Sequence, residues 1–185
     1  MSERILNGVV WIMGFSGAGK STLAGSLAKQ IRHRGYSPIL MDADDLKEVF
    51  RVNGYKECRQ SRVEWGLRTA RLCRHLSRQG YVVIRPNVGL LREVFEWNRY
   101  NLDNYFEIVL DTPIAELIQH DEKGLYRKIS TGQEKHMFGV DLEPDWPSNP
   151  DWICDFRHSH DARAVVEKLT NSIIAKFDKE RPACT

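Results

Sequence analysis

Gly14-Phe15-Ser16-Gly17-Ala18-Gly19-Lys20-Ser21-Thr22 fits the pattern G-x-x-x-x-G-K-[ST] at every fixed position. A short apolar run, Val9–Met13, precedes this stretch and is typical of a buried strand. Apolar residues at helical spacing follow it as far as Ile31. A strand, a glycine-rich loop and a helix form the context in which the pattern binds phosphate. The sequence therefore predicts a phosphate-binding loop, in preference to a glycine-rich turn that binds nothing.

The chemistry of this loop indicates a nucleoside triphosphate as its ligand. Glycines let backbone N–H groups turn inward around an anion, and the following helix adds the positive end of its dipole. Lys20 can reach the β- and γ-phosphates, and the Ser21 hydroxyl can bind Mg²⁺. Lys20 is therefore also a predicted catalytic residue. The predicted nucleotide-binding residues of the loop are Gly14, Ser16, Gly17, Ala18, Gly19, Lys20, Ser21 and Thr22.

The chain has 185 residues and a formal net charge of +2. This length predicts one domain, spanning residues 1–185, with a substantial core. The small charge does not favour nucleic acid or an anionic membrane as partner. No apolar run approaches the roughly 20 residues of a membrane span, and no signal segment precedes the first strand, so we expect a cytoplasmic protein. The four cysteines are scattered, which argues against a zinc site or a disulfide framework.

Apolar runs alternate with helical patterns along the chain. Further strands are expected at 37–41, 81–84, 105–110 and near 153, and helices at 46–50, 61–80, 91–98, from 114, and after a Ser159 cap. Each strand reads as a continuous apolar run, which favours a mostly parallel sheet covered on both faces. The predicted class is therefore α/β, a three-layer α/β/α fold of the P-loop NTPase type. Residues past the strand ends should converge on one cleft: Gly14–Thr22, Asp42–Asp45, Arg85–Asn87 and Asp111.

The acidic cluster Asp42, Asp44 and Asp45 follows the second strand. A carboxylate at this position could orient an acceptor hydroxyl and take its proton, or hold Mg²⁺ through water. The alternative is a helix N-cap, for which Asp is well suited. The pattern predicts that at least one of these side chains faces the cleft, and it does not choose among the three.

Two further segments carry an excess of basic residues. Most of the arginines between 51 and 78 are expected on a solvated helix face, but Arg62 and Arg68 lie near the helix start and could bind an acceptor phosphate. The charged run 120–128 is either a plain loop or a basic segment that covers the phosphates and excludes water. Lys123, Arg127 and Lys128 suit the second role.

The chain resembles the adenylylsulfate kinase family over about Val9 to Pro147. The resemblance starts with the phosphate-binding loop and continues with Met41-Asp42-Ala43-Asp44, where the family has L-D-G-D. Asp111-Thr112-Pro113 follows, and then Asp121-Glu122-Lys123-Gly124-Leu125-Tyr126, where the family has D-P-K-G-L-Y. Gly139 and Asp141 stand where the family has F-T-G-I-D.

This resemblance implies transfer of the γ-phosphate of MgATP to the 3′-hydroxyl of adenylylsulfate, by a homodimer with a mobile lid at about residues 120–147. It implies that Asp44 faces the acceptor hydroxyl and that Lys123 acts in catalysis from the lid. His120 and Arg127 are then nucleotide-binding residues. The implied acceptor-binding residues are Asp42, Lys47, Arg62, Trp65, Arg68, Asn87, Lys123 and Met137.

The chain departs from the family mostly where the family grips its acceptor. Lys47 replaces an arginine fork, and Trp65 stands in place of an asparagine. Trp65 could stack on the acceptor base or be an ordinary core residue. The family's I-S-P turn is Val88-Gly89-Leu90, and Met137 and Phe138 replace a phenylalanine and a threonine. His120 replaces the arginine of R-D-P-K.

The chain is also similar to a divergent branch of the family that accompanies bacterial capsule or surface-polysaccharide genes. At least one member of this branch phosphorylates the ribose of cytidine diphosphoramidate. The stretches that carry this similarity are 91–99, 105–108 and 139–142. We therefore expect a kinase for a small nucleotide conjugate other than adenylylsulfate. A true adenylylsulfate kinase is the alternative, and a non-catalytic ATP-binding module is a more distant one.

Overall fold

The computed structural model describes residues 6–50, 58–121, 124–133, 135–156, 159 and 161–179. Its centre is a five-stranded sheet with the strand order β2-β3-β1-β4-β5, in which every pair of neighbours is parallel. The strands are β1 (Gly8–Gly14), β2 (Pro38–Leu40), β3 (Val82–Asn87), β4 (Tyr105–Leu110) and β5 (Trp152–Cys154). The parallel sheet and all four later strands predicted from the sequence are confirmed.

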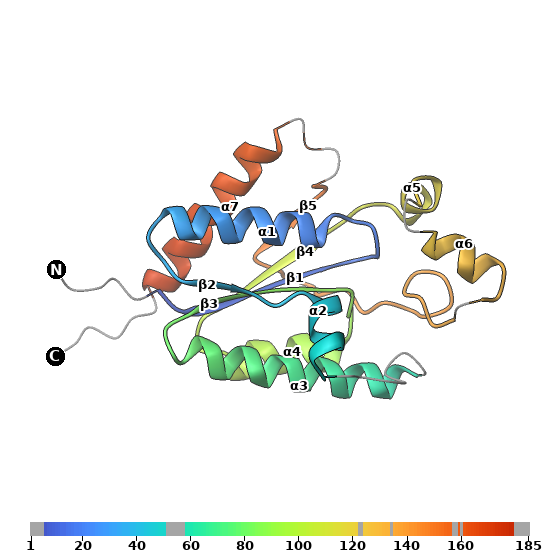
Figure 1. Cartoon of the computed structure of the whole chain (residues 1–185), viewed down its shortest axis with the longest axis horizontal. Helices are drawn as coiled ribbons and strands as arrows, with labels where there is room; N and C mark the ends of the chain where they lie inside the picture. The colour runs from blue at the N-terminus through green and yellow to red at the C-terminus, as the bar shows by residue number, and fades with distance from the viewer. Residues whose placement is uncertain are drawn as a thin grey trace, which may run out of the picture.

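Helices cover both faces of this sheet (Figure 1). One face carries α1 (Lys20–His33) and α7 (Ala162–Lys179), and the other carries α3 (Arg59–Ser77) and α4 (Arg92–Asn101). Successive residues of a strand point to opposite faces. Val9, Trp11 and Met13 accordingly pack in one hydrophobic core, whereas Val10 and Ile12 pack in the other. Burying each such side chain contributes about 1.5–3 kcal/mol, so the all-apolar β1 holds three layers together.

Three shorter helices follow strands β2 and β4 along the chain. Helix α2 (Ala43–Phe50) follows β2, and α5 (Ile114–Gln119) and α6 (Leu125–Ser130) follow β4. Figure 1 shows α5 and α6 outside the three layers, at the end of the sheet where β1 passes into α1. Both helices lie after residue 113, and α6 lies inside the predicted lid, residues 120–147.

The third strand is longer than the sequence predicted. It continues through Asn87, so Arg85 lies within β3 and is fully buried, rather than at the cleft as expected. Its guanidinium donates hydrogen bonds to the carbonyl oxygens of Met41 at 3.0 Å and Pro86 at 2.8 Å. It also lies 5.9 Å from the centroid of the Trp11 ring. These partners offset part of the cost of burying a charge that propensity alone would place outside.

Two predicted helix starts also need correction. Asp161, not Ser159, caps α7, because its carboxylate accepts a hydrogen bond from the N–H of Ala164 at 2.9 Å. The helix expected from Ser61 begins at Arg59, after Cys58, whose sulfur accepts from the N–H of Ser61 at 3.4 Å. The loop predicted at 51–59 otherwise falls on residues 51–57, which lie outside the described residues.

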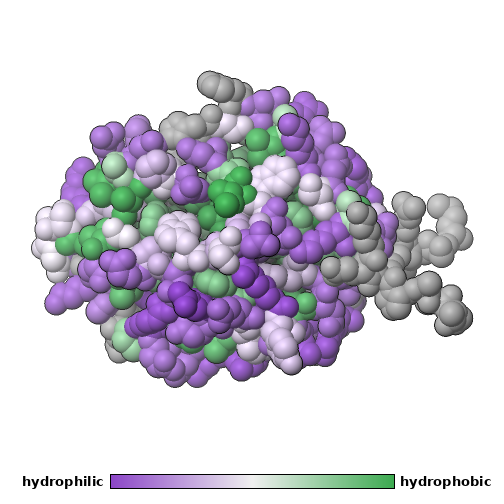
Figure 2. All heavy atoms as spheres, turned by 180° about the vertical axis from the view of Figure 1, so that it is seen from behind, coloured by the Kyte–Doolittle hydropathy of each residue, from purple (hydrophilic) through white to green (hydrophobic). Residues whose placement is uncertain are grey.

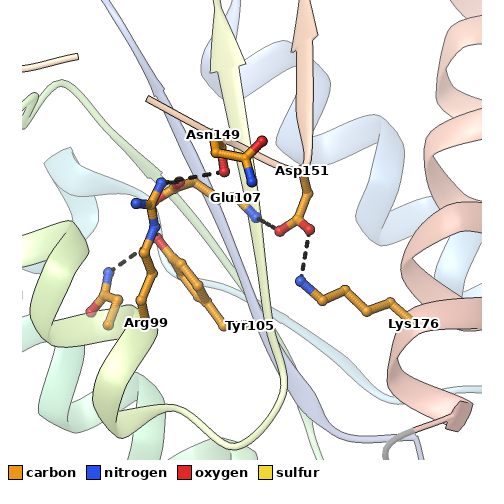
Figure 3. Close-up of polar contacts among 7 residues, drawn as sticks. Arg99, Tyr105, Glu107, Asn149, Asp151 and Lys176 are labelled. Atoms are coloured by element: carbon orange, nitrogen blue, oxygen red, sulfur yellow. Dashed lines mark hydrogen bonds and ion pairs between the residues drawn. The ribbon is translucent and has the colours of Figure 1, made fainter. Parts of the chain in front are cut away.

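A polar network fixes β5 and α4 to β4 (Figure 3). Arg99 of α4 pairs with the buried carboxylate of Glu107, which also accepts from the Tyr105 hydroxyl at 2.9 Å. Asp151, just before β5, accepts from the N–H of Glu107 at 2.9 Å and from Lys176 of α7 at 2.7 Å. Burial raises the pKa of Glu107, against the opposing effect of the Arg99 guanidinium. The network thus joins α4 to β4 through the Glu107 carboxylate, and joins β4 to α7 through the Asp151 carboxylate.

Candidate active site

The phosphate-binding loop joins the end of β1 to the start of α1. Gly17 and Gly19 have φ of 84° and 90°, in the left-handed region that favours glycine. The loop closes on itself because the N–H of Ala18 donates to the Phe15 carbonyl oxygen at 3.2 Å. The glycine conformations and the helix start that follows them are thus those of a loop suited to bind a phosphate group.

Lys20 points into this loop rather than into solvent. Lys20 is the first residue of α1, and only 8% of it is exposed. The ammonium donates a hydrogen bond to the Phe15 carbonyl oxygen at 2.6 Å. A buried cation beside a cluster of backbone N–H groups makes the loop strongly positive, so it favours a polyanionic ligand.

The Ser21 hydroxyl donates to Asp42 Oδ2 at 2.7 Å. This contact confirms that the ends of β1 and β2 converge, as the parallel sheet predicts. A hydroxyl and a carboxylate are the oxygen ligands that suit Mg²⁺, which usually keeps several waters and binds substrate phosphates as well. No cluster of three His, Cys, Asp or Glu that could hold a metal occurs in the described parts of the chain. These two residues therefore fit Mg²⁺ held jointly with a nucleotide.

The three acidic residues have different surroundings. Asp42 caps α2, because its Oδ1 accepts from the N–H of Asp44 at 3.1 Å, so the N-cap role expected of this cluster falls to Asp42. The Asp44 side chain is 75% exposed and lies 2.7 Å from the ammonium of Lys47. Asp45 is exposed on the next position of α2. Asp44 is thus the first exposed carboxylate after Asp42 along the chain.

The predicted acceptor residues on α3 do not all share one face. Arg62 donates to the His136 carbonyl oxygen, and its guanidinium lies 5.3 Å from the centroid of the Phe138 ring. Arg68 is exposed, and it lies six residues, about 1.7 turns, further along α3. The structure therefore does not bring Arg68 beside Arg62.

Trp65 lies in the hydrophobic core that includes α3, with only 8% of its surface exposed. The edge of its ring meets Phe50, the last residue of α2, with the ring centroids 5.8 Å apart. Of the two interpretations that the sequence left open, this position favours a core tryptophan over a ring that stacks on a base.

Asn87 and Met137 are the remaining predicted acceptor residues, and they lie in different elements of the chain. Asn87 is the last residue of β3 and is level with Met13, next to the start of the phosphate-binding loop. Met137 is half-buried against the core, and its N–H donates to Asp141. Asp141 also accepts from the N–H of His136 at 2.6 Å. Desolvation opposes ionisation of Asp141, but these N–H groups outweigh it and hold its pKa below the ordinary 3.8.

The predicted lid contacts the phosphate-binding loop through α6. The carboxylate of Asp121 accepts from the N–H groups of Leu125 at 2.8 Å and Arg127 at 2.9 Å, and so caps this short helix. Tyr126, which lies between these two residues, donates a hydrogen bond from its hydroxyl to the Ser16 carbonyl oxygen at 2.9 Å. The Arg127 side chain is exposed. His120 is also exposed, with Nδ1 3.0 Å from the Glu116 carbonyl oxygen, and Lys123 lies outside the described residues.

Phe15 and Trp146 form a contact that the sequence did not predict. Their rings meet edge to face, with centroids 5.3 Å apart. Gly139 lies against the same phenylalanine, because a Cβ there would stand 2.8 Å from Phe15 Cε1. The only sequence signal was that Trp146 lies in Pro144-Asp145-Trp146-Pro147, where two prolines restrict the backbone. That signal indicates a rigid segment and does not identify its partner.

A recess of about 370 Å³ lies over the network of Figure 3, lined by Arg99, Tyr105, Glu107, Asn149, Asp151 and Lys176 among others. Tyr105 begins β4, whereas the phosphate-binding loop follows the end of the parallel neighbour β1. The recess therefore lies toward the opposite end of the sheet from the loop.

Among the described residues, no helix is long and apolar enough to cross a membrane. On the face shown in Figure 2, apolar side chains occur in small groups among hydrophilic ones.

A sequence profile of the family described as adenylylsulphate kinase matches residues 7–155. The chain belongs to this family. The cytidine diphosphoramidate kinase of Campylobacter jejuni subsp. jejuni serotype O:2 is 32% identical over 169 residues, which cover 91% of this chain and 95% of that protein. The adenylyl-sulfate kinase of Gloeothece citriformis is 31% identical over 176 residues, covering 92% and 93%.

Known structures agree on the fold. The APS kinase CysC from Mycobacterium tuberculosis, in complex with AMPPNP and APS, superposes with a TM-score of 0.80 over 91% of this chain and 98% of its own, at 24% sequence identity. A shikimate kinase from Aquifex aeolicus has a TM-score of 0.54 at 13% identity. The fold is thus that of the P-loop kinases. Family membership makes the protein a phosphotransferase with a hydroxyl group as acceptor, with ATP as the donor that family and loop indicate.

Proposed function

We propose that this kinase transfers the γ-phosphoryl group of ATP to the ribose 3′-hydroxyl of a small nucleotide conjugate other than adenylylsulfate, of the cytidine diphosphoramidate type. The observation that carries the proposal is the contrast between the two halves of the site. The donor side keeps Lys20 in its loop and the Ser21–Asp42 pair. On the acceptor side, the family's arginine is Lys47, paired with Asp44, and the family's asparagine is the core residue Trp65.

The donor side supports phosphoryl transfer by positioning and charge. The loop N–H groups and Lys20 would bind the β- and γ-phosphates of ATP. Ser21 and Asp42 would hold Mg²⁺, which when bound supplies positive charge to the phosphate oxygens. The nucleotide-binding set is completed by Gly14, Ser16, Gly17, Ala18, Gly19 and Thr22 of the loop, and by His120 and Arg127. Lys123 is proposed to add a catalytic positive charge from the lid.

The acceptor side would be organised around Asp44. This carboxylate would accept a hydrogen bond from the attacking hydroxyl, orient it and take its proton. Lys47 and Arg62 would bind acceptor phosphates. Arg68 would have to contact these phosphates from a position on α3 that is not beside Arg62. Asp42, Asn87, Lys123 and Met137 complete the proposed acceptor-binding set, whereas Trp65, which the sequence also suggested, belongs to the core. Because little covalent chemistry is needed from the protein, alignment of hydroxyl and γ-phosphate is the main task.

We further propose a single-domain, cytoplasmic homodimer in which residues 120–147 act as the lid. The contact of Tyr126 with Ser16 supports a lid that reaches the donor site. Light scattering coupled to size-exclusion chromatography tests the dimer, and a monomer mass at micromolar concentration contradicts it.

The test of function is incubation of the protein with MgATP and a panel of acceptors, followed by mass spectrometry of the products. The panel contains cytidine diphosphoramidate, adenylylsulfate and other nucleoside diphosphate conjugates. Phosphorylation of cytidine diphosphoramidate or a related conjugate supports the proposal. Product from adenylylsulfate alone identifies a true adenylylsulfate kinase. ATP binding without any product favours the non-catalytic alternative.

A further inference from the structure

Asp145 connects the end of the lid segment to three elements. Its Oδ2 accepts from the Arg59 guanidinium at 2.5 Å and from the N–H of Arg92 at 2.9 Å. Its own N–H donates to the Leu90 carbonyl oxygen at 2.9 Å. Arg59 begins α3, Arg92 begins α4, and Leu90 lies in the turn after β3. Asp145 thus joins the starts of α3 and α4, and the turn after β3, to the end of the proposed lid segment.

The segment that ends at Asp145 is held on the donor side as well. The next residue, Trp146, meets Phe15 of the phosphate-binding loop, and Gly139 packs on the same phenylalanine. One turn after Arg59 on α3, Arg62 bonds to the His136 carbonyl oxygen and covers Phe138. The segment 136–146 therefore bridges α3, which carries the proposed acceptor residue Arg62, and the loop that would hold ATP.

We propose that Asp145 is a positioning residue for phosphoryl transfer, which fixes the start of α3 relative to the phosphate-binding loop by holding Arg59. This inference rests on the proposed function, since it concerns how the acceptor is aligned with ATP. The effect of such alignment is large, because a misplacement of about 1 Å can reduce an enzymatic rate about 100-fold.

The surroundings of Arg59 explain why Asp145 carries this role. Arg59 also pairs with Glu93 at 2.8 Å, but the Glu93 side chain is 50% exposed, whereas that of Asp145 is 22% exposed. Exposed pairs contribute little because water and salt screen them. Only Asp145 also binds the backbone of α4 and of the Leu90 turn. Its pKa is lowered, since the Arg92 N–H and the Arg59 guanidinium outweigh desolvation, so it is ionised at neutral pH.

The test compares Asp145→Asn and Asp145→Glu with the control Glu93→Gln, which removes the other ion pair of the same arginine. Steady-state kinetics are measured with MgATP and the acceptor that gives product in the panel, and binding of AMPPNP is measured by calorimetry. For Asp145→Asn we expect kcat/KM for the acceptor to fall about 10- to 100-fold, with AMPPNP affinity within about twofold of wild type. Asp145→Glu should recover part of this loss, and Glu93→Gln should lose less than about threefold.

Hydrogen exchange of the amides at 137–147 supplies a readout that needs no acceptor. Asp145→Asn should speed this exchange while the exchange of β1 and β4 stays unchanged. Faster exchange with unchanged acceptor kinetics would make the contact merely structural and overturn the proposal. Unchanged exchange overturns it too. If no acceptor in the panel is turned over, the proposed function fails while the exchange result still decides whether Asp145 holds the segment. The double variant Arg59→Gln/Asp145→Asn should be no worse than Asp145→Asn alone, and additive losses would contradict coupling through this pair.

Discussion

The Tyr126 hydroxyl donates a hydrogen bond to the Ser16 carbonyl oxygen at 2.9 Å, which joins α6 to the phosphate-binding loop. Burial, reinforced by Asp121, raises the pKa of Tyr126 to about 12, so the hydroxyl keeps its proton at any physiological pH. The same carbonyl belongs to the loop whose N–H groups would bind ATP. One hydroxyl group therefore links α6, within the proposed lid, to the loop that would hold ATP.

Replacing Tyr126 by Phe should weaken this link without emptying the space that the ring fills. A lost hydrogen bond of this kind costs about 0.5–1.5 kcal/mol, so we expect KM for ATP to rise about two- to tenfold. Steady-state kinetics at varied ATP concentration check the change. Tyr100→Phe is the matched control, because Tyr100 is 91% exposed. Equal KM values for the two variants would contradict a linking role.

Asp44→Ala should remove most turnover while ATP still binds. A positioned general base contributes about 10²–10⁴-fold to a rate, and the loop that would hold ATP does not include this side chain. The measurement is product formation by mass spectrometry beside calorimetric titration with AMPPNP. Asp45→Ala, at the neighbouring exposed position of α2, serves as the control and should keep near wild-type activity. Wild-type turnover in Asp44→Ala would refute the assignment of Asp44.

Ser21→Ala should raise the Mg²⁺ concentration that half-maximal activity requires. The substitution removes one oxygen of the Ser21–Asp42 pair, at 2.7 Å, that is proposed to hold the ion. Titration of activity with MgCl₂ at fixed ATP measures the shift, for which we expect about tenfold or more. Ser26→Ala, on the same helix, removes only a hydroxyl that donates to the Thr22 carbonyl oxygen and should not shift the curve. Superimposable curves for the two variants would remove Ser21 from the metal site.

The sequence predicted the layers and the strand–loop–helix arrangement around Gly14–Thr22 because both depend on local pattern. The apolar run Val9–Met13 specifies a strand buried on both faces. The loop that follows has glycines, Gly17 and Gly19, at two positions where φ is in the left-handed region. Strand ends of a parallel sheet meet at one edge, so Asp42 could be placed near Ser21 without knowing the structure. The strand and the loop are thus specified by neighbouring residues, whereas the position of Asp42 follows from the geometry of a parallel sheet.

Contacts across long stretches of chain could not be predicted in this way. Nothing near Phe15 in the sequence indicates that Trp146 meets it, and a β-pattern that stops at Ile84 hides the three further residues of β3. Arg85 would be costly inside a sheet without its two carbonyl partners, and local sequence does not reveal those partners. The choice between a stacking and a core role for Trp65 likewise depended on the position of Phe50.

The turn at 136–142 should make stability depend on acid pH. The folded pKa of Asp141 is lowered, so its contribution is present above its unfolded pKa of about 3.9 and is lost as the pH falls toward the folded value. The stability difference between wild type and Asp141→Asn should therefore be constant above pH 5 and shrink below about pH 4. Urea unfolding at a series of pH values measures it. A difference that grows with acidity would contradict the lowered pKa.

Two glycines inside helices should respond to alanine with opposite signs. At Gly25 of α1 a Cβ would meet nothing within 4 Å, so Gly25→Ala should stabilise the fold by about 0.5–1 kcal/mol through the loss of backbone freedom in the unfolded chain. At Gly66 of α3 a Cβ would stand 2.7 Å from Val94 Cγ2 of α4. Valine is stiff at χ1, so the helices must separate, at a cost of about 1–3 kcal/mol. This cost exceeds the helix gain, and Gly66→Ala should be destabilised in urea unfolding.

Because α3 carries Arg59 and Arg62, its displacement should also lower acceptor turnover, whereas Gly25→Ala should leave turnover unchanged. Equal stability of the two variants would show that α3 and α4 are not closely packed at this point.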